Sequence, residues 1–256
     1  MLISAGIHST DLAKRISELT CIKLVKSYTS NFADQELNVE VEEIQSNKNK
    51  HIIIIHTISF PVHDNLIELL LLIDALKRAL SPNRITLIVP YCCYTRQDRV
   101  MYRNLNNINI VSALSAKVIA NILKTINVNN MIFIDLHEIQ VAVIDKYRKK
   151  PGVSEVMNII GNVENKECII IDDIVDSGGT LCNAASALKN NGALQVSAYI
   201  THGVLSNNAI AKIVNSQLDT LTITDTVNHC SINTPKIKVL SIDKFLSDYI
   251  LHNLTN

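Results

Sequence analysis

Short runs rich in isoleucine and valine alternate along this chain with longer segments that have helical periodicity. Repeated βαβ units around parallel sheets give this pattern, because strands that are covered on both faces are apolar throughout. The candidate strands are residues 51–57, 84–90, 131–136, 141–144, 168–171, 195–201, 220–224 and 238–241. The alternation predicts an α/β fold with mainly parallel sheets.

Helices are predicted between these strands from the spacing of apolar residues. Residues 65–80 place leucine and isoleucine on one helical face, with Glu68 among the residues available for the wet face. The same reasoning predicts helices over residues 112–124, 179–190 and 243–251. Asn191 and Gly192 supply a C-terminal stop for the second of these three helices.

A polar, asparagine-rich stretch at residues 99–110 follows a basic segment and precedes a predicted helix. We interpret this stretch as a flexible loop, because clustered polar residues between periodic segments are typical of loops. A disordered linker between two domains is the alternative for a stretch of this length.

The junction between the predicted strands at residues 131–136 and 141–144 is physically awkward. Both segments read as buried strands, yet only residues 137–140 separate them. Neighbouring parallel strands need a crossover of about a dozen residues or more. The two strands therefore belong to different domains, or the chain has been shortened here.

The composition limits the classes of protein that fit. At 256 residues the chain can form two modest domains, each with its own core. Lysine plus arginine number 24, as do aspartate plus glutamate, so no net charge attracts nucleic acid or an anionic membrane. The six cysteines lack CxxC spacing and read as reduced thiols rather than as a zinc site. No stretch reaches the roughly 18 apolar residues that span a bilayer. We expect a cytoplasmic protein with neither nucleic-acid nor membrane partners.

The strongest local signal is the segment from Cys168 to Thr180, in which a buried strand breaks into an acidic, glycine-rich turn that opens a helix. Gly178 and Gly179 let the backbone approach a ligand, so that N–H groups and the positive helix end can surround a phosphate. The serine and threonine of the turn add hydroxyl donors. Asp172 and Asp173 suit the hydroxyls of a sugar or a magnesium ion. A phosphorylated sugar matches both the carboxylates and the phosphate-binding turn. We therefore interpret this segment as a sugar-phosphate site rather than as an ordinary turn with a capping aspartate.

The run from Asp172 to Thr180 resembles the phosphoribosyl-binding loop that phosphoribosyltransferases share with ribose-phosphate pyrophosphokinases. Three further segments resemble the pyrophosphokinases alone. Residues 31–36 (NFADQE) are similar to their adenine-contacting hairpin, residues 90–99 (PYCCYTRQDR) to their ATP loop, and residues 135–137 (DLH) to their metal motif. Residues 145–150 (DKYRKK) resemble their catalytic basic loop. The resemblance covers nearly the whole chain in order.

The resemblance implies a magnesium-dependent transferase of nucleotide biosynthesis, a homo-oligomeric ribose-phosphate diphosphokinase that acts on ATP and ribose 5-phosphate. It implies two similar phosphoribosyltransferase-like α/β domains, residues 1–140 for ATP and a shortened second domain, residues 141–256, for ribose 5-phosphate. The residues that it assigns are Lys146 and Arg148 for catalysis, His137 for the metal, Phe32, Asp34, Glu36, Arg96, Gln97, Asp98 and Arg99 for ATP, and Asp172, Asp173, Asp176, Ser177, Gly178, Gly179 and Thr180 for ribose 5-phosphate.

The residue types suit these roles. The planar forks of Arg96 and Arg99 can pair with triphosphate oxygens, and Phe32 can stack on adenine. Mobile cations such as those of residues 145–150 stabilise the charge that spreads over a transferring phosphoryl group. Without the resemblance, Phe32 reads about equally well as a core aromatic, and residues 145–150 read as a solvated basic patch.

Departures from the family pattern bear on activity. The segment that normally separates the histidine motif from the basic loop, including a Ser-Pro-Asp-x-Gly-Gly turn, is absent after Gln140. Gln35 stands where the family has glycine. The alternative function is therefore a catalytically impaired or inactive homologue that serves as an assembly or regulatory subunit. A phosphoribosyltransferase is the third candidate, but the three segments that resemble the pyrophosphokinases alone argue against it.

Overall fold

The computed structural model describes residues 1–43, 50–105, 108–135, 144–147, 156–159, 162–229 and 232–255. Contacts divide the chain into two compact units. Unit 1 comprises Met1–Leu136 together with Ile242–Asn256, and unit 2 comprises His137–Ser241. The C-terminal helix therefore packs with unit 1, whereas the sequence grouped it with residues 141–256. The predicted domain boundary between residues 140 and 141 lies outside the described residues.

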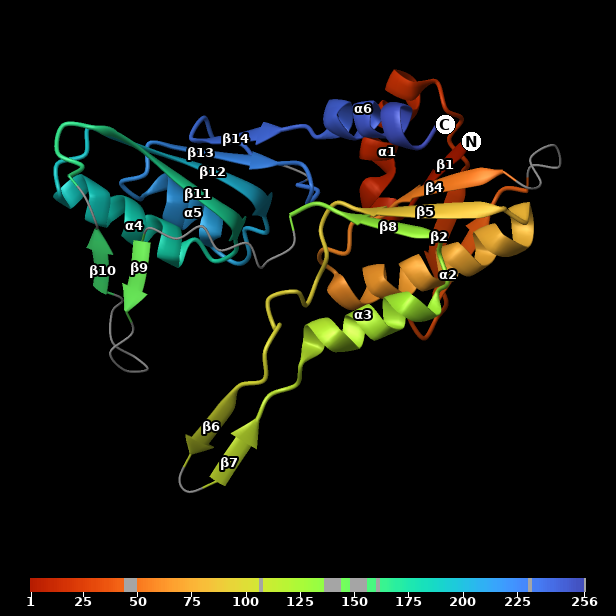
Figure 1. Ribbon diagram of the computed structural model, residues 1–256, viewed down its shortest axis with the longest axis horizontal. Helices are drawn as coiled ribbons and strands as arrows, with labels where there is room; N and C mark the ends of the chain where they lie inside the picture. The colour runs from red at the N-terminus through yellow and green to blue at the C-terminus, as the bar shows by residue number, and fades with distance from the viewer. Residues whose placement is uncertain are drawn as a thin grey trace. The chain divides into compact units, whose positions relative to one another are not determined.

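Unit 1 is built on a parallel sheet of four strands in the order β1-β4-β5-β8. Its strands are β1 (Leu2–Ala5), β4 (His51–Ile55), β5 (Arg84–Val89) and β8 (Asn130–Phe133), and its helices are α1 (Thr10–Thr20), α2 (Val62–Leu80), α3 (Ser115–Thr125) and α6 (Asp243–Asn253), with a 3-10 helix, η1, at Ile7–Ser9. Helices α2 and α3 cover one face of the sheet, and α1 and α6 cover the other (Figure 1). Ile52 and Ile54 point into the first layer, and Ile53 and Ile55 into the second. This strand is buried on both faces, as predicted.

Helix α6 completes the second layer of unit 1. Its Leu246 and Ile250 are buried in the same core as Ile16 of α1. At the rim of this contact, Nε of Arg15 donates a hydrogen bond of 2.8 Å to Oδ2 of Asp243. Among the described residues no helix combines the length and the apolar composition needed to cross a bilayer.

Two antiparallel hairpins also belong to unit 1. One joins β2 (Ser27–Asn31) to β3 (Leu37–Val41), and the other joins β6 (Tyr102–Leu105) to β7 (Ile108–Val111). The prediction of a flexible loop or linker over residues 99–110 was therefore wrong. Asparagines that read as loop formers face each other across the strands, where Nδ2 of Asn104 donates to Oδ1 of Asn109 at 2.9 Å. Such a cross-strand pair is not visible in a linear pattern of polar residues.

Unit 2 is built on a second parallel sheet, in the order β11-β12-β13-β14. Its elements are β9 (Ile144–Tyr147), β10 (Val156–Ile159), β11 (Glu167–Val175), α4 (Gly179–Asn190), β12 (Gln195–Gly203), α5 (Ala209–Val214), β13 (Thr220–Thr224) and β14 (Ile237–Leu240). Side chains of α4 and α5 share one core with Val196, Leu221 and Ile223 of the sheet (Figure 1). The predicted α/β fold with mainly parallel sheets is confirmed.

The two strands at the awkward junction belong to different units. Strand β8 lies in unit 1, and β9, which begins at Ile144, lies in unit 2. Residues 141–143 of the predicted strand lie outside the described residues. Strand β9 pairs antiparallel with β10 and not with a parallel sheet. Ile144 therefore lies in an antiparallel pair of strands and not in one of the parallel sheets.

One face of β11 is exposed, although its apolar run predicted cover on both sides. Ile170 is only 9% exposed and packs in the core shared with α4. Ile169 and Ile171 point the other way and are 63% and 81% exposed, and Tyr199, the partner of Ile171 on β12, is exposed as well. In the described part of the sheet β11 is also an edge strand. An apolar run therefore does not guarantee a strand with two covered faces.

Glu68 of α2 is buried, although the sequence assigned it to the wet face. Its side chain is 3% exposed, and Oε1 accepts hydrogen bonds from the N–H of Ile7, at 3.0 Å, and from the hydroxyl of Thr29, at 2.7 Å. The prediction was wrong because periodicity cannot reveal partners that come from distant elements. Buried polar groups are tolerated where such partners satisfy them.

The orientation of β11 can be tested with two neighbouring substitutions. Ile170→Ala should lower the free energy of unfolding by about 2–4 kcal/mol, because it removes buried methyl and methylene groups. Ile171→Ala should change it by less than about 0.5 kcal/mol, because this side chain is already largely in solvent. Chemical denaturation of both variants measures the difference, and equal losses would contradict the orientation.

The stability of unit 1 should depend on pH through His56. Burial lowers the pKa of His56 below its usual 6.5, and nearby His8 adds to this effect, while the Glu68 carboxylate and the Asn65 carbonyl oppose it. The unfolded chain therefore takes up a proton near pH 6.5 that the folded chain does not take up, so the free energy of unfolding should fall as the pH decreases below about 6.5. Thermal unfolding at pH 7.5 and 5.5 measures this slope. The slope should be smaller in His56→Gln, and an unchanged slope would assign the effect to other groups of unit 1 such as His51, whose pKa burial also lowers.

Candidate active site

The acidic, glycine-rich turn of unit 2 connects the end of β11 to the start of α4. Strand β11 continues through Asp172 and Asp173 as far as Val175. Gly178 precedes α4 with φ 73° and ψ −5°, in the left-handed region that strains any other residue. A Cβ atom at this position would also lie 3.3 Å from Cγ1 of Ile213. The reversal of the chain into α4 therefore requires glycine at position 178.

Backbone hydrogen bonds connect this turn to the loop that follows β12. The loop after β12 donates the N–H groups of Val204 and Leu205 to the carbonyl of Val175, at 2.9 and 3.1 Å. Within the described residues, no backbone hydrogen bond has an N–H group of residues 177–180 as its donor. Unpaired N–H groups at the start of a helix, where the helix dipole is positive, form an arrangement that binds phosphate.

The two carboxylates lie just before this turn, at the carboxyl end of the second sheet. Asp172 is exposed and Asp173 is half-buried. Oδ1 of Asp172 accepts the N–H of Asp173 at 3.0 Å, which fixes the first carboxylate beside the backbone. Carboxylate oxygens in this place can accept hydrogen bonds from hydroxyl groups of a ligand or hold a magnesium ion together with phosphate oxygens.

A buried polar cluster lies beside these carboxylates and was not among the predicted site residues. The strand register places Ile174, His202 and Thr224 in one row across three strands. Nδ1 of His202 is hydrogen-bonded to the hydroxyl of Thr226 at 2.9 Å, and the hydroxyl of Thr224 donates to the carbonyl of Thr201 at 2.7 Å. The position of these residues at the ends of two parallel strands was the signal that could have identified them.

In unit 1, the segment after β5 is anchored by buried side chains before it turns outward. Tyr91, Cys92 and Cys93 are buried, and burial raises the pKa of Cys92 to about 11 and that of Cys93 to about 12. Both cysteines are therefore protonated, unreactive thiols near neutral pH. The hydroxyl of Tyr94 is hydrogen-bonded to Nδ1 of His63 at 2.9 Å, which ties the segment to the start of α2.

The polar residues that follow lie at the surface. The N–H of Gln97 donates to the carbonyl of Tyr94 at 3.2 Å, and its Oε1 accepts the hydroxyl of Ser115. Arg96 and Arg99 are exposed, and Nε of Arg99 lies 3.7 Å from Oδ1 of the half-buried Asp98. An exposed ion pair of this length is weak, so the Arg99 guanidinium can reorient toward an anionic ligand.

Phe32, Asp34 and Glu36 lie together in the turn between β2 and β3. The N–H of Phe32 donates to the carbonyl of Glu36 at 2.8 Å, and Oδ1 of Asp34 accepts the N–H of Glu36 at 3.2 Å. Phe32 is 56% exposed, so the interpretation of this residue as a core aromatic was wrong. Gln35, which stands where the family has glycine, has φ 74°, a conformation that favours glycine.

The predicted metal and catalytic residues are only partly described. Asp135, with φ 48°, lies two residues after the end of β8, at the same end of the first sheet as residues 90–99. His137 and Arg148 lie outside the described residues. Lys146 lies in β9, where the backbone alone is described. In the parts of the chain that the structure describes, no group of three or more histidine, cysteine, aspartate or glutamate side chains could hold a metal ion.

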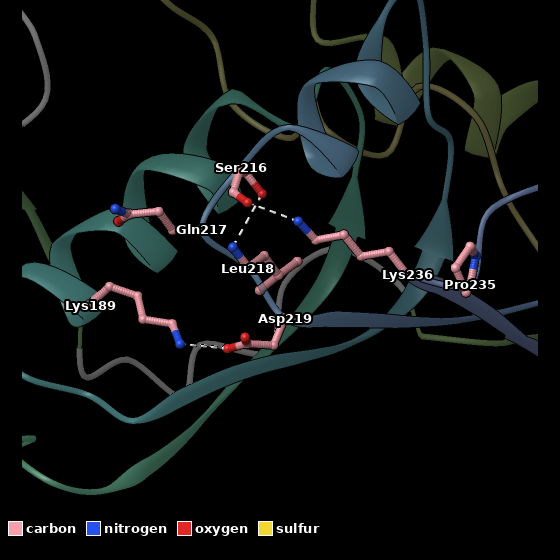
Figure 2. Close-up of a pocket in the computed structure, with 7 residues that line it drawn as sticks. All are labelled: Lys189, Ser216, Gln217, Leu218, Asp219, Pro235 and Lys236. Carbon is pink, nitrogen blue, oxygen red and sulfur yellow. Dashed lines mark hydrogen bonds and ion pairs between the residues drawn. The ribbon is translucent and has the colours of Figure 1, made fainter.

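A pocket of about 600 Å³ lies where β13 and β14 begin, at the amino end of the second sheet (Figure 2). Nζ of Lys189 pairs with Oδ2 of Asp219 at 2.8 Å. Nζ of Lys236 donates to the carbonyls of Val214 and Ser216, at 3.0 and 2.8 Å. Both ammonium groups are thus engaged with oxygens of the protein, and the pocket contains none of the predicted site residues.

Comparisons with known proteins agree along the whole chain. A family model described as the N-terminal domain of ribose phosphate pyrophosphokinase matches residues 1–126, and one described as a phosphoribosyl synthetase-associated domain matches residues 134–255. A ribose-phosphate pyrophosphokinase of Mesorhizobium japonicum is 36% identical over 312 aligned positions, which cover 100% of this chain and 97% of that protein. The corresponding protein of Brucella melitensis is 35% identical, with 98% of this chain and 96% of that protein covered.

The fold is also similar to that of a solved phosphoribosylpyrophosphate synthetase. The crystal structure of phosphoribosylpyrophosphate synthetase from Mycobacterium smegmatis matches with a TM-score of 0.83 and 25% identity, over 98% of this chain and 97% of that chain.

The alignments also bear on the shortened segment. The alignment with the M. japonicum protein has 312 positions and this chain has 256 residues, so at least 56 positions, the difference between the two, hold no residue of this chain. Since all of this chain is covered, those positions lie within the alignment and not beyond its ends. An internal shortening agrees with the departure from the family pattern that the sequence indicated. Apart from this shortening, the match extends from end to end, and the chain belongs to the ribose-phosphate pyrophosphokinase family.

Proposed function

We propose that this chain is an active ribose-phosphate diphosphokinase. It transfers the pyrophosphoryl group of ATP to the 1-hydroxyl of ribose 5-phosphate, which gives phosphoribosyl pyrophosphate and AMP. The observation that carries the proposal is the turn before α4, where two carboxylates precede a row of N–H groups without backbone partners at the start of a helix. The end-to-end match to pyrophosphokinases supports it.

The turn suits a sugar phosphate because its two parts recognise opposite groups. The N–H groups of residues 177–180 and the hydroxyls of Ser177 and Thr180 donate hydrogen bonds to the 5-phosphate, next to the positive end of the α4 dipole. Asp172 and Asp173 repel a phosphate but accept hydrogen bonds from the ribose hydroxyls. The phosphate therefore lies toward α4 and the ribose ring toward the end of β11.

The nucleotide is the proposed ligand of unit 1. The exposed ring of Phe32 stacks on adenine, and Asp34 and Glu36 accept hydrogen bonds from its amino group or from the ribose. Arg96 and Arg99 pair with the triphosphate. Their surface position supports this role, because a guanidinium buried in an internal ion pair could not reach a ligand.

The transfer itself requires positioning and charge stabilisation more than covalent chemistry. The 1-hydroxyl oxygen forms a bond to the β-phosphorus of ATP and gives up its proton to solvent. At the same time the bond from that phosphorus to the oxygen that it shares with the α-phosphorus breaks, and AMP leaves with that oxygen. Lys146 and Arg148 stabilise the charge that spreads over the transferring group. His137, with the neighbouring Asp135, is the proposed holder of Mg²⁺. The ion, when bound, neutralises charge on the phosphates.

We also propose that the protein is a homo-oligomer of the cytoplasm. The resemblance to the family supports the oligomer. The compartment is supported by the state of the described cysteines, since Cys21, Cys92, Cys93, Cys168 and Cys182 are all free thiols, as is usual in reducing compartments.

The proposed activity can be measured as AMP release from ATP, magnesium and ribose 5-phosphate. The double variant Lys146→Ala/Arg148→Ala should lower kcat by about 10²–10³-fold, because it removes two cations from the transition state. Lys244→Ala, which removes an exposed lysine at the start of α6, is the matched control and should retain wild-type activity. Wild-type protein that is folded and oligomeric but releases no more AMP than the double variant would replace this proposal with that of an assembly or regulatory subunit.

The assignment of the acidic turn is tested by binding. Asp172→Asn/Asp173→Asn should weaken the affinity for ribose 5-phosphate by about tenfold or more, because charge-assisted hydrogen bonds to the sugar are lost. The affinity for ATP should stay within about twofold, which corresponds to a change of less than 0.5 kcal/mol. Glu167→Gln, an exposed charge at the other end of β11, serves as the control. Titration calorimetry measures both affinities, and equal losses for the two ligands would show that the turn is misassigned.

A further inference from the structure

The hairpin that carries Phe32 is attached to unit 1 differently on its two strands. On β3, Val39 and Val41 pack against the core beneath α2. On β2, the attachments are hydrogen bonds: the hydroxyl of Ser27 donates to the carbonyl of Ala5 at 2.9 Å, and that of Thr29 donates to Oε1 of Glu68 at 2.7 Å. Apolar packing is not directional, so the polar contacts of β2 decide how the hairpin is oriented.

One oxygen of Glu68 connects three elements. Glu68 lies on α2, and its Oε1 accepts both the hydroxyl of Thr29 on β2 and the N–H of Ile7 in η1, at 3.0 Å. Both bonds go to an oxygen of a buried acidic group, and hydrogen bonds to charged groups are stronger than neutral ones. This single oxygen therefore fixes three elements to one another: the β2–β3 hairpin, η1 and α2.

The surroundings of Glu68 leave its carboxylate little freedom. His56 is 1% exposed and its Nε2 lies 3.9 Å from Oε2 of Glu68, but this nitrogen is 2.8 Å from the carbonyl of Asn65. A carbonyl can only accept, so Nε2 carries a proton and points it at Asn65. A Cβ atom on Gly6 would lie 2.1 Å from Nδ1 of His56 and 3.0 Å from Oε2 of Glu68, which leaves no space for another side chain there.

Stability alone does not account for a carboxylate in this place. Oε2 of Glu68 has no hydrogen-bond partner among the described residues, and burying such an atom costs free energy. An apolar side chain of similar size would avoid this cost but would leave the N–H of Ile7 and the hydroxyl of Thr29 without this acceptor. What the carboxylate adds is direction, because its two bonds fix the angle of β2 and with it the turn that bears Phe32.

We infer that Glu68 is a positioning residue for the nucleotide, which acts through Thr29 to hold the hairpin in the orientation that binds ATP. The inference rests on the proposed function, because it takes the hairpin to contact ATP. A buried residue of α2 that does not belong to the exposed turn would thus affect the affinity for ATP.

Substitution of Glu68 tests this inference, because it should change KM for ATP and not KM for ribose 5-phosphate. Glu68→Ala should raise KM for ATP by about tenfold, because two charge-assisted hydrogen bonds are lost, and should leave KM for ribose 5-phosphate within about twofold. Glu68→Gln retains an oxygen that accepts both bonds and should recover most of the affinity for ATP. Thr29→Val, which leaves Glu68 in place, should shift KM for ATP in the same direction by a smaller factor. Glu40→Gln, an exposed carboxylate on β3 of the same hairpin, is the matched control and should behave as wild type.

Several outcomes would overturn the inference. A role confined to stability would lower kcat with the folded fraction and leave both KM values unchanged, and equal rises in the two KM values would be just as contrary. If Glu68→Ala does not fold, Thr29→Val decides, since an unchanged KM for ATP in that variant contradicts the coupling.

A wild type without activity would remove the proposed function, and amide hydrogen exchange would then decide on Glu68 separately. Exchange should rise selectively at residues 27–41 in Glu68→Ala, and unchanged exchange there would overturn the positioning role.

Discussion

Parallel strand pairing is the constraint on which both units depend, because it brings the carboxyl ends of all strands in a sheet to the same side. In unit 1, residues 90–99 and Asp135 emerge there, after β5 and β8. In unit 2 the acidic turn follows β11, and the ends of β12 and β13 add hydroxyls and an imidazole. The pocket at the amino end of the second sheet has lysines that are engaged with protein oxygens (Figure 2). The direction of the strands therefore places the candidate site residues of each unit at the carboxyl end of its sheet.

The features predictable from the sequence are those that depend on neighbours along the chain. The helix at 179–190 has the predicted bounds, because Gly178 takes a left-handed conformation before it and Gly192 takes one after it. The β6–β7 hairpin could not be predicted from its asparagines, since their pairing depends on register across strands. The candidate turn was identified because its glycines, hydroxyls and carboxylates are contiguous. Glu68 and His202 were missed because their partners lie many residues away.

In the described part of the chain, the second sheet is covered less completely than the first. A parallel sheet normally has helices on both faces, and the first sheet has two such cores. Among the described residues the second sheet has one core, and on its other face Ile169, Ile171 and Tyr199 are exposed on adjacent strands. The alignment with the M. japonicum relative has at least 56 positions that hold no residue of this chain. In the described part of unit 2, α4 and α5 form the layer that shares a core with the sheet, so the stability of this unit depends on their packing.

Both units place buried polar groups directly beneath the loops that would meet a ligand. His56 and Glu68 occupy this level in unit 1, and His202 and Thr226 occupy it in unit 2, and all four are almost fully buried. If the apolar core continued to this level, the loops would be held by contacts that many orientations satisfy equally well. Hydrogen bonds such as that from Thr29 to Glu68 accept few orientations, so they trade some stability for a defined loop geometry. Precise placement of substrate is what a phosphoryl-transfer enzyme needs most, since positioning and electrostatics supply nearly all of its catalysis.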